Sequence, residues 1–167
     1  TFFRGAGYRF AGPDDFLEDP EENCVFLSFD DNYQAWYDAL DLLDESGVEA
    51  TFYVNTCAIR ERSSATDIGS YYDRLGYDGP RQPLSSAEIR AIADAGHTVG
   101  SHTHSHRKLT AMSFDDAVTD IATGKAELEA ILGAPVCHFA YPYGMRRHFD
   151  ERLRSACQSM GFRTIAN

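Results

Sequence analysis

Short apolar segments alternate along this chain with longer segments whose apolar residues recur at helical spacing. The apolar runs are bounded by turn residues, as expected for buried parallel strands. Strands are therefore predicted over residues 24–29, 50–55, 97–100, 136–140 and 162–166. Helices are predicted between them, over residues 33–46, 85–95, 110–132 and 148–160. This alternation favours a parallel sheet or barrel built from strand–helix–strand units.

Two stretches depart from this rhythm. Residues 1–23 are rich in glycine, proline and acids, and turns are expected at 13–15 and 19–22. The aromatic residues of this stretch are expected to cap one end of a barrel; they are Phe2, Phe3, Tyr8 and Phe10. Residues 60–83 are polar with interleaved tyrosines, and are predicted to form a long surface loop. That loop is either a substrate-facing element or a surface insertion.

Length and charge limit the classes of function. The 167 residues are enough for a single domain with its own core, and we assign residues 1–167 to one domain. The net charge of -11 disfavours nucleic-acid binding, because phosphate contacts need clustered lysine and arginine. Anionic membranes and polymers are also disfavoured, unless a metal or a local basic patch intervenes. Neutral or cationic substrates fit the overall charge better.

Targeting and redox signals are sparse. No apolar run approaches the roughly 20 residues of a transmembrane span. No signal peptide is visible, and because the chain begins at Thr1 we expect a processed or trimmed form. The cysteines are widely scattered and form no C-x-x-C pair, so a disulfide network is not expected. The cysteines are Cys24, Cys57, Cys137 and Cys157.

Polar residues gather where three predicted strands end. Asp30 and Asp31 follow the first strand, and three histidines fall within residues 102–106 after the third. The segment 141–144, Tyr-Pro-Tyr-Gly, follows the fourth. Adjacent acids alone are often turn residues or helix caps. In a strand, however, neighbouring side chains point to opposite faces, so one carboxylate can bind a metal while the other takes a proton.

The histidines indicate a metal site. Histidines four residues apart meet on one face of a helical turn, and histidines two apart meet on one face of a strand; either geometry can bind zinc. Two histidines and one aspartate leave coordination positions open, as catalytic rather than structural zinc sites do. Outside this stretch, His97 is expected to be structural, His138 to lie in a strand, and His148 to be exposed.

These segments together resemble the polysaccharide deacetylase family, the NodB-homology domain of carbohydrate esterase family 4. Ser28-Phe29-Asp30-Asp31 matches the first motif of the family, and His102-Thr103-His104-Ser105-His106 matches the second. Tyr141-Pro142-Tyr143-Gly144 matches the third. Order and spacing agree from about residue 24 onwards. The resemblance implies a distorted TIM-like (β/α)7-type α/β barrel with its active site at the carboxyl ends of the strands.

The resemblance also implies roles for these residues. Asp31, His102 and His106 hold a divalent metal, with zinc preferred and cobalt, nickel or manganese as alternatives. Asp30 is the catalytic base that activates water. The backbone N–H of Tyr143 stabilises the oxyanion. His104 falls at a variable position and is not expected to be a ligand. Substrate binding is assigned to Tyr141, Pro142 and Tyr143.

The sequence departs from the family pattern at two points. Ala140 occupies the position of an arginine that usually orients the base, and Arg146 or Arg147 is a candidate substitute. No histidine follows His148, although the family supplies a general acid near its C-terminus. The family barrel also needs one or two further strands. The chain is therefore a fragment lacking its last strands, is complemented by other residues, or departs from the family mechanism.

The predicted function is metal-dependent hydrolysis of N-acetyl, or less often O-acetyl, groups on a polysaccharide or oligosaccharide. An acetylated glycan is the expected partner, and the resemblance favours the cell envelope or a secreted location. Two alternatives stay open. One is a non-catalytic carbohydrate-binding pseudoenzyme, suggested by the missing general acid. The other is a related carbon–nitrogen hydrolase acting on a small amide or imide.

Overall fold

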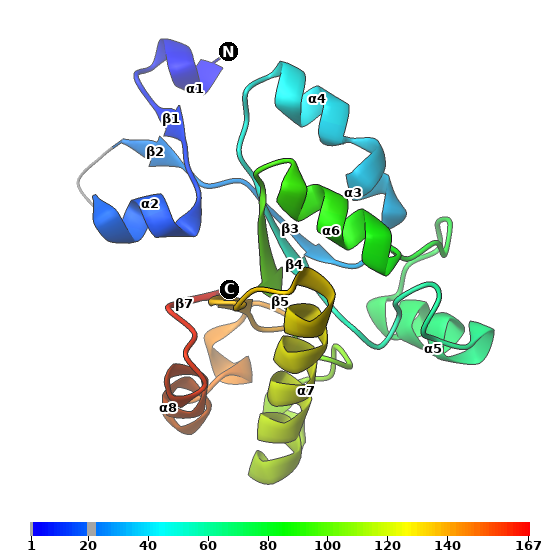
Figure 1. Ribbon diagram of the computed structural model, residues 1–167. Coiled ribbons are helices and arrows are strands. Elements are labelled where there is room, and N and C mark those ends of the chain that lie inside the picture. The colour runs from blue at the N-terminus through cyan, green and yellow to red at the C-terminus, as the bar shows by residue number, and fades with distance from the viewer. Residues whose placement is uncertain (1, 20–22) are drawn as a thin grey trace.

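The computed structural model describes residues 2–19 and 23–167. A parallel sheet runs through the molecule, with its strands in sequence order. The strands are β3 (Ser28–Asp31), β4 (Thr51–Val54), β5 (Thr98–Ser101), β6 (His138–Ala140) and β7 (Thr164–Ala166). The sheet curls into a half-barrel (Figure 1), which confirms the predicted α/β class. Closure into a (β/α)7-type barrel stays a prediction.

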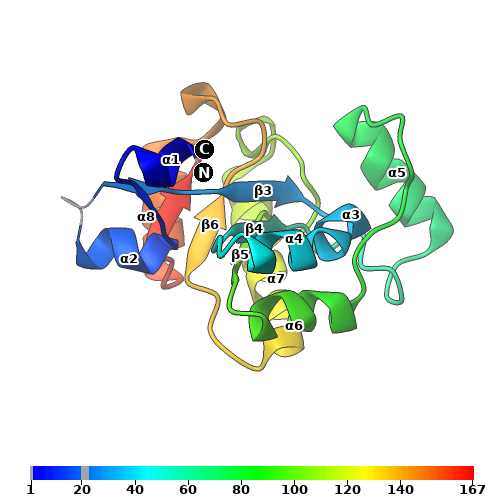
Figure 2. The same ribbon diagram turned by 90° about the horizontal axis from the view of Figure 1, so that it is seen from above.

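Helices occupy the connections between these strands, and all but α5, which stands beyond the end of the sheet, lie along its outer face (Figure 2). They are α3 (Gln34–Asp38), α4 (Leu40–Glu45), α5 (Ala65–Leu75), α6 (Ser86–Asp94), α7 (Phe114–Leu132) and α8 (Glu151–Ser159). Ile92 of α6 and Ile121 and Leu128 of α7 are fully buried. They belong to the same apolar cluster as Phe52 of β4 and Phe139 of β6. The core therefore lies between the sheet and its helices.

The first predicted strand and the first predicted helix are each divided. Within residues 24–29, β2 (Cys24–Val25) pairs with β1 (Arg9–Phe10), whereas β3 pairs with β4. The single strand was a wrong prediction because the two halves of the apolar run pair with different neighbours. The helix predicted over 33–46 is interrupted at Ala39, where α3 ends and α4 begins.

The N-terminal stretch contains α1 (Phe2–Gly5) and α2 (Pro13–Glu18). Phe2, Phe3 and Tyr8 are exposed and make edge-to-face contacts within this stretch, so the predicted barrel cap is wrong. The turn predicted at 13–15 is the first turn of α2, because proline is well tolerated at the first helical positions. The turn predicted at 19–22 includes residues outside the described part of the chain.

The surface loop predicted over 60–83 contains helix α5. Ser64 caps this helix by accepting the N–H of Asp67, and the Asp67 side chain in turn accepts the N–H of Ser64. Tyr71 and Tyr72 are fully buried rather than on the surface. The loop prediction was wrong because the polar residues form one face of a helix whose other face is covered.

Two of the connections between strands also contain a short 3-10 helix: η1 (Leu109–Ala111) precedes α7, and η2 (Arg146–His148) precedes α8. His148 is buried, which corrects the predicted exposure. All four cysteines are free thiols. Among the described helices, none combines the length and apolar character needed to cross a membrane.

Candidate metal centre and active site

A cavity of about 350 Å³ opens at the carboxyl edge of the sheet. Because neighbouring strands are parallel, β3, β5 and β6 all end at this edge. Each predicted motif therefore reaches the same place, although the motifs are far apart in the sequence. The cavity is lined by Asp30, Asp31, Leu75, His102, His106, Tyr143 and Gly144.

Three of these side chains converge on a common point. Asp31 Oδ1 lies 3.1 Å from His106 Nε2 and 3.7 Å from His102 Nε2. His102 Nδ1 lies 2.8 Å from the carbonyl oxygen of Ala140. With Nδ1–H donating to that carbonyl, the lone pair of Nε2 faces Asp31, which is how ligating histidines are commonly oriented.

This arrangement fits a divalent cation. The ligand atoms of Asp31, His102 and His106 all lie within 4.8 Å of one another. Asp31 Oδ1 is buried and accepts no hydrogen bond from the described residues, so the triad contains an acceptor that lacks a donor. Two imidazoles and one carboxylate suit zinc and other borderline metals, and they leave coordination positions open.

The backbone around the cavity is unusual. In the described chain, the non-glycine residues with positive φ all lie at this site: Asp31 (81°), Thr103 (69°), His106 (53°) and Tyr143 (70°). Such conformations cost about 1–3 kcal/mol each and persist where the surroundings hold them. Because Asp31 leaves the extended conformation, both carboxylates line the same cavity, which corrects the expectation of opposite faces.

Residues 102–106, which we call the histidine loop, are neither helix nor strand. Their shape comes from side-chain hydrogen bonds. Thr103 Oγ1 accepts the N–H of His106 at 3.1 Å. Asn55, at the end of β4, donates from Nδ2 to the carbonyl oxygen of His102, and its Oδ1 accepts the hydroxyl of Tyr71 at 3.1 Å. Buried polar groups of α5 and of the residue that follows β4 therefore support the loop that carries His102 and His106.

Asp30 lies at the mouth of the cavity, beside the triad. Partial burial raises its pKa; the His102 imidazole opposes this shift, and the Asp31 carboxylate reinforces it. Among the described residues, the charged groups that act on Asp30 are His102, Asp31 and His106. The candidate substitutes for the missing arginine, at positions 146 and 147, are not among them.

The third motif forms a turn beside the histidines. Tyr143 is 46% exposed, and its ring packs 5.0 Å from that of His106. Tyr141 is buried, and its ring stacks on that of Phe149 at 4.8 Å. This ring therefore supports the turn and does not line the cavity. Pro142 is also buried within the turn.

The remaining histidines have other surroundings. His97 is buried and its Nδ1 accepts the N–H of Ala50 at 3.4 Å, which matches the predicted structural role. His138 is buried in β6. His104 points away from the cavity, toward Glu127 at 3.1 Å. The ring of His148 lies 5.8 Å from that of Tyr143, and His148 does not line the cavity.

Sequence reasoning missed Asn55 and Tyr71 as parts of the site. Asn55 directly follows β4, as His102 directly follows β5, and this position at a strand end was the available signal. Tyr71 carried no such signal, because its segment was interpreted as a loop.

Comparisons with known proteins agree with the motifs. The profile of the polysaccharide deacetylase family matches residues 18–165. A chitin deacetylase from Pestalotiopsis sp. is 31% identical over 122 residues, covering 72% of this chain and 34% of that protein. IcaB from Ammonifex degensii has a similar fold, with a TM-score of 0.76 and 23% identity over 98% of this chain and 70% of that one. The deacetylase PplD from Streptococcus pyogenes, in complex with acetate, gives a TM-score of 0.73 at 21% identity, covering 96% and 65%.

The chain spans less than half the length of the first curated relatives it matches. The profile match nevertheless extends over most of this chain, and it includes all three motifs identified from the sequence. On this basis, the chain belongs to the polysaccharide deacetylase family.

Proposed function

We propose that this protein hydrolyses acetyl groups on a glycan, chiefly N-acetyl groups, with a divalent metal as cofactor. The observation that carries the proposal is the convergence of Asp30, Asp31, His102 and His106 in one cavity of a family member. The Pestalotiopsis relative is named for chitin, a polymer of N-acetylated sugars, which supports an acetylated glycan as substrate. A glycan of the cell envelope or outside the cell is the expected target.

Asp31, His102 and His106 would hold the metal, with zinc the expected ion. A bound divalent cation supplies Lewis acidity, which makes water a better nucleophile near neutral pH and polarises an acyl oxygen. The chain contributes the orientation of the ligands. His102 is aligned by the Ala140 carbonyl, and the histidine loop is held by Asn55.

Asp30 would accept the proton of the attacking water. The carboxylate lies in the same cavity as the triad but outside it, so it is free to take a proton. Its raised pKa brings it closer to the working pH, which favours a general base. The backbone N–H of Tyr143 would donate to the oxyanion, as hydrogen-bond donors aimed at developing charge commonly do.

The exposed ring of Tyr143 would also contact the sugar, because aromatic faces suit pyranose rings. Tyr141 and Pro142 would act indirectly, by holding the turn that carries Tyr143. The stacking of Tyr141 on Phe149 provides that support.

Acetate release from acetylated chito-oligosaccharides and other acetylated glycans tests the proposal. The zinc-loaded wild type should release acetate, and Asp30→Asn should lose this activity while it still binds zinc. Asp31→Asn and His106→Ala should lose both. The proposal fails if the wild type, in the full-length protein, releases no acetate from any of these glycans, or if Asp30→Asn is as active as the wild type.

A non-catalytic carbohydrate-binding protein is the second candidate. One observation favours it: no arginine is among the charged groups that act on Asp30 in the described chain. This alternative predicts glycan binding without turnover, and binding that survives removal of the metal with a chelator. Calorimetric titration of the same oligosaccharides with and without zinc distinguishes the two functions.

A further inference from the structure

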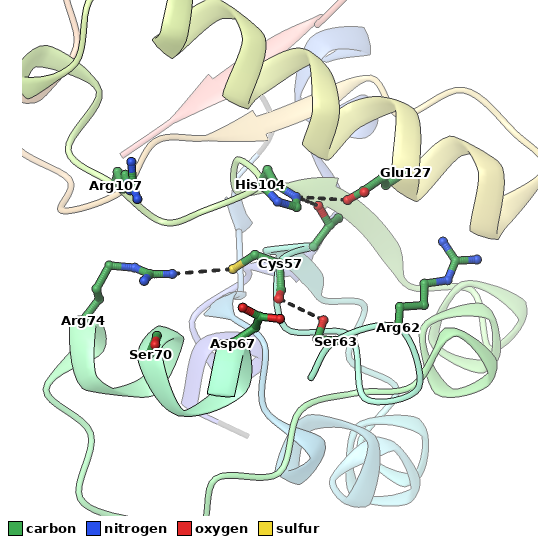
Figure 3. Close-up of a pocket in the computed structure, with 10 residues that line it drawn as sticks. Cys57, Arg62, Ser63, Asp67, Ser70, Arg74, His104, Arg107 and Glu127 are labelled. Atoms are coloured by element: carbon green, nitrogen blue, oxygen red, sulfur yellow. Dashed lines mark hydrogen bonds and ion pairs between the residues drawn. The ribbon is translucent and has the colours of Figure 1, made fainter. Parts of the chain in front are cut away.

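A second cavity, of about 420 Å³, lies between α5, the histidine loop and α7 (Figure 3). It is separate from the metal cavity, although the two share a wall. Arg74 lines this cavity, whereas the next residue, Leu75, lines the metal cavity. His104 and Arg107 line it as well, whereas His102 and His106 face the metal cavity.

Basic residues outnumber acidic residues around this cavity. Three arginines line it, Arg62, Arg74 and Arg107, against two carboxylate residues, Asp67 and Glu127, in a chain whose net charge is -11. In Figure 3, Arg74 and Arg107 stand on one side of Cys57 and Arg62 on the other. Arg74 points toward the Cys57 sulfur, into the space that the cavity encloses.

The carboxylates at this cavity already have partners. Asp67 accepts hydrogen bonds from the backbone N–H and the hydroxyl of Ser64, as part of the α5 cap. Glu127 Oε2 lies 3.1 Å from His104 Nδ1. Asp120, on the same side of α7, accepts the N–H of Ser105 at 3.2 Å. None of these carboxylates is paired with one of the three arginines.

The arginines, in contrast, retain unused donors. Among the described residues, the guanidinium groups of Arg62 and Arg107 donate no hydrogen bond and form no ion pair, although Arg62 is close enough to Glu61 to help lower the pKa of that carboxyl. Arg74 donates from Nε to the carbonyl oxygen of Ser105 at 3.2 Å, and one terminal nitrogen contacts Cys57 Sγ at 3.8 Å. Its other terminal N–H groups are available.

We propose that the cavity between α5, the histidine loop and α7 is an anion-binding site for a carboxylate or phosphate group carried by the glycan. Planar guanidinium groups match the geometry of both anions through paired N–H donors. The Cys57 thiol adds no competing charge, because burial raises its pKa to about 11. The cavity is a local basic patch of the kind that overrides the repulsion between an acidic protein and an anionic polymer.

The proposal deepens the deacetylase function and rests on it for the identity of the polymer. Arg74 and Leu75 are consecutive residues, and each lines one of the two cavities. On this proposal, an acetylated residue would occupy the metal cavity while an acidic substituent of the same glycan contacts the arginines. The expected substrate class is therefore an acidic acetylated glycan, with uronic acid or phosphate groups, rather than a purely neutral one.

Equilibrium binding tests the site independently of turnover. The probes are glucuronate, its neutral counterpart glucose, and inorganic phosphate, titrated calorimetrically at low ionic strength, where charge screening is weak. The wild type should bind glucuronate or phosphate but not glucose. Arg62→Gln, at an exposed residue with no hydrogen-bond partner in the described chain, should weaken binding several-fold, and the Arg62→Gln/Arg107→Gln double variant by about tenfold or more. Arg154→Gln on α8, outside the cavity, is the matched control and should bind as the wild type does.

The same titration on His106→Ala separates this site from the metal centre. Anion binding should persist in that variant, because the arginines do not depend on the metal. A preference for phosphate over glucuronate assigns the site to a phosphate substituent, and the reverse assigns it to a uronic acid. The proposal is overturned if neither anion binds the wild type, if the double variant binds equally well, or if binding disappears in His106→Ala alone.

Acetate release then connects the site to the substrate. In the double variant, kcat/KM should fall for acidic acetylated oligosaccharides and stay unchanged for neutral ones. Equal loss on both kinds of oligosaccharide would contradict the proposed substrate class. If the wild type binds the anions but releases no acetate from any glycan, the deacetylase function is contradicted and the anion site is still supported.

Discussion

Replacing Asn55 with alanine tests whether the protein scaffold, rather than the metal alone, positions the ligands. Asn55 is fully buried and connects three elements. Its Nδ2 donates to the carbonyl oxygen of His102 and lies 3.4 Å from the carbonyl oxygen of Thr103, and its Oδ1 accepts the Tyr71 hydroxyl. The histidine loop adopts positive φ at Thr103 and His106, so it needs such external support.

The expected loss of stability follows from the groups left without partners. Asn55→Ala leaves two buried polar groups without a hydrogen-bond partner, the His102 carbonyl and the Tyr71 hydroxyl. At about 1–3 kcal/mol for each unsatisfied group, the free energy of unfolding should fall by roughly 2–6 kcal/mol. Zinc affinity should fall by about 10–100-fold, as it does when groups that orient metal ligands are removed.

Two assays and a matched pair of variants measure these effects. Urea denaturation of metal-free protein gives the stability, and calorimetric titration gives the zinc affinity. Tyr71→Phe and Tyr72→Phe each remove one buried hydroxyl from α5, at a cost of about 1 kcal/mol. Only Tyr71 bonds to Asn55; Tyr72 donates to the Asn32 carbonyl instead. Zinc affinity should therefore fall in Tyr71→Phe and stay unchanged in Tyr72→Phe.

One result would refute this reasoning. If Asn55→Ala is destabilised as expected but binds zinc as tightly as the wild type, the loop takes its shape from the metal. Equal zinc affinities in the two tyrosine variants would support that conclusion.

Three further predictions concern stability. Burial lowers the pKa of His97, so below the unfolded pKa of 6.5 the unfolded chain binds more protons than the folded chain. The free energy of unfolding should therefore decrease as the pH falls from 6.5 toward the lowered pKa. Urea denaturation at several pH values should show a flatter decrease in His97→Gln. Gly124→Ala should destabilise the protein by about 1–3 kcal/mol and weaken zinc binding, because an added Cβ would lie 2.7–2.9 Å from backbone atoms of the histidine loop. An unchanged midpoint of thermal denaturation would contradict this prediction. Ser64→Ala should cost about 1 kcal/mol through loss of the α5 cap, measured by urea denaturation, with Ser155→Ala in α8 as a control that caps nothing.

Much of the fold was predictable because it depends on local patterns. Alternating apolar runs and amphipathic segments indicated the strands of the main sheet and most of its helices. The histidine loop and the Asp30–Asp31 pair were identifiable because metal chemistry uses few residue types, and their positions at strand ends predicted that they would meet.

The predictions that failed depended on contacts between distant segments. Helix α5 was interpreted as a loop, since the burial of Tyr71 and Tyr72 depends on packing against Tyr33 and Ala58, which come from other segments. The apolar run at 24–29 was interpreted as one strand, because the sequence does not show that its halves pair with different neighbours. The exposure of His148 was wrong for the same kind of reason, since tertiary packing covers it.

The sequence by itself determined the family, the α/β class and the residues able to bind a metal. Periodicity and residue chemistry are properties of short segments, so they can be followed along the chain. Only the tertiary structure decided that Asp31 turns into the same cavity as Asp30, that Asn55 supports the histidine loop, and that three arginines share a second cavity. Each of these depends on backbone angles or on side chains brought together from separate elements, which no single segment specifies.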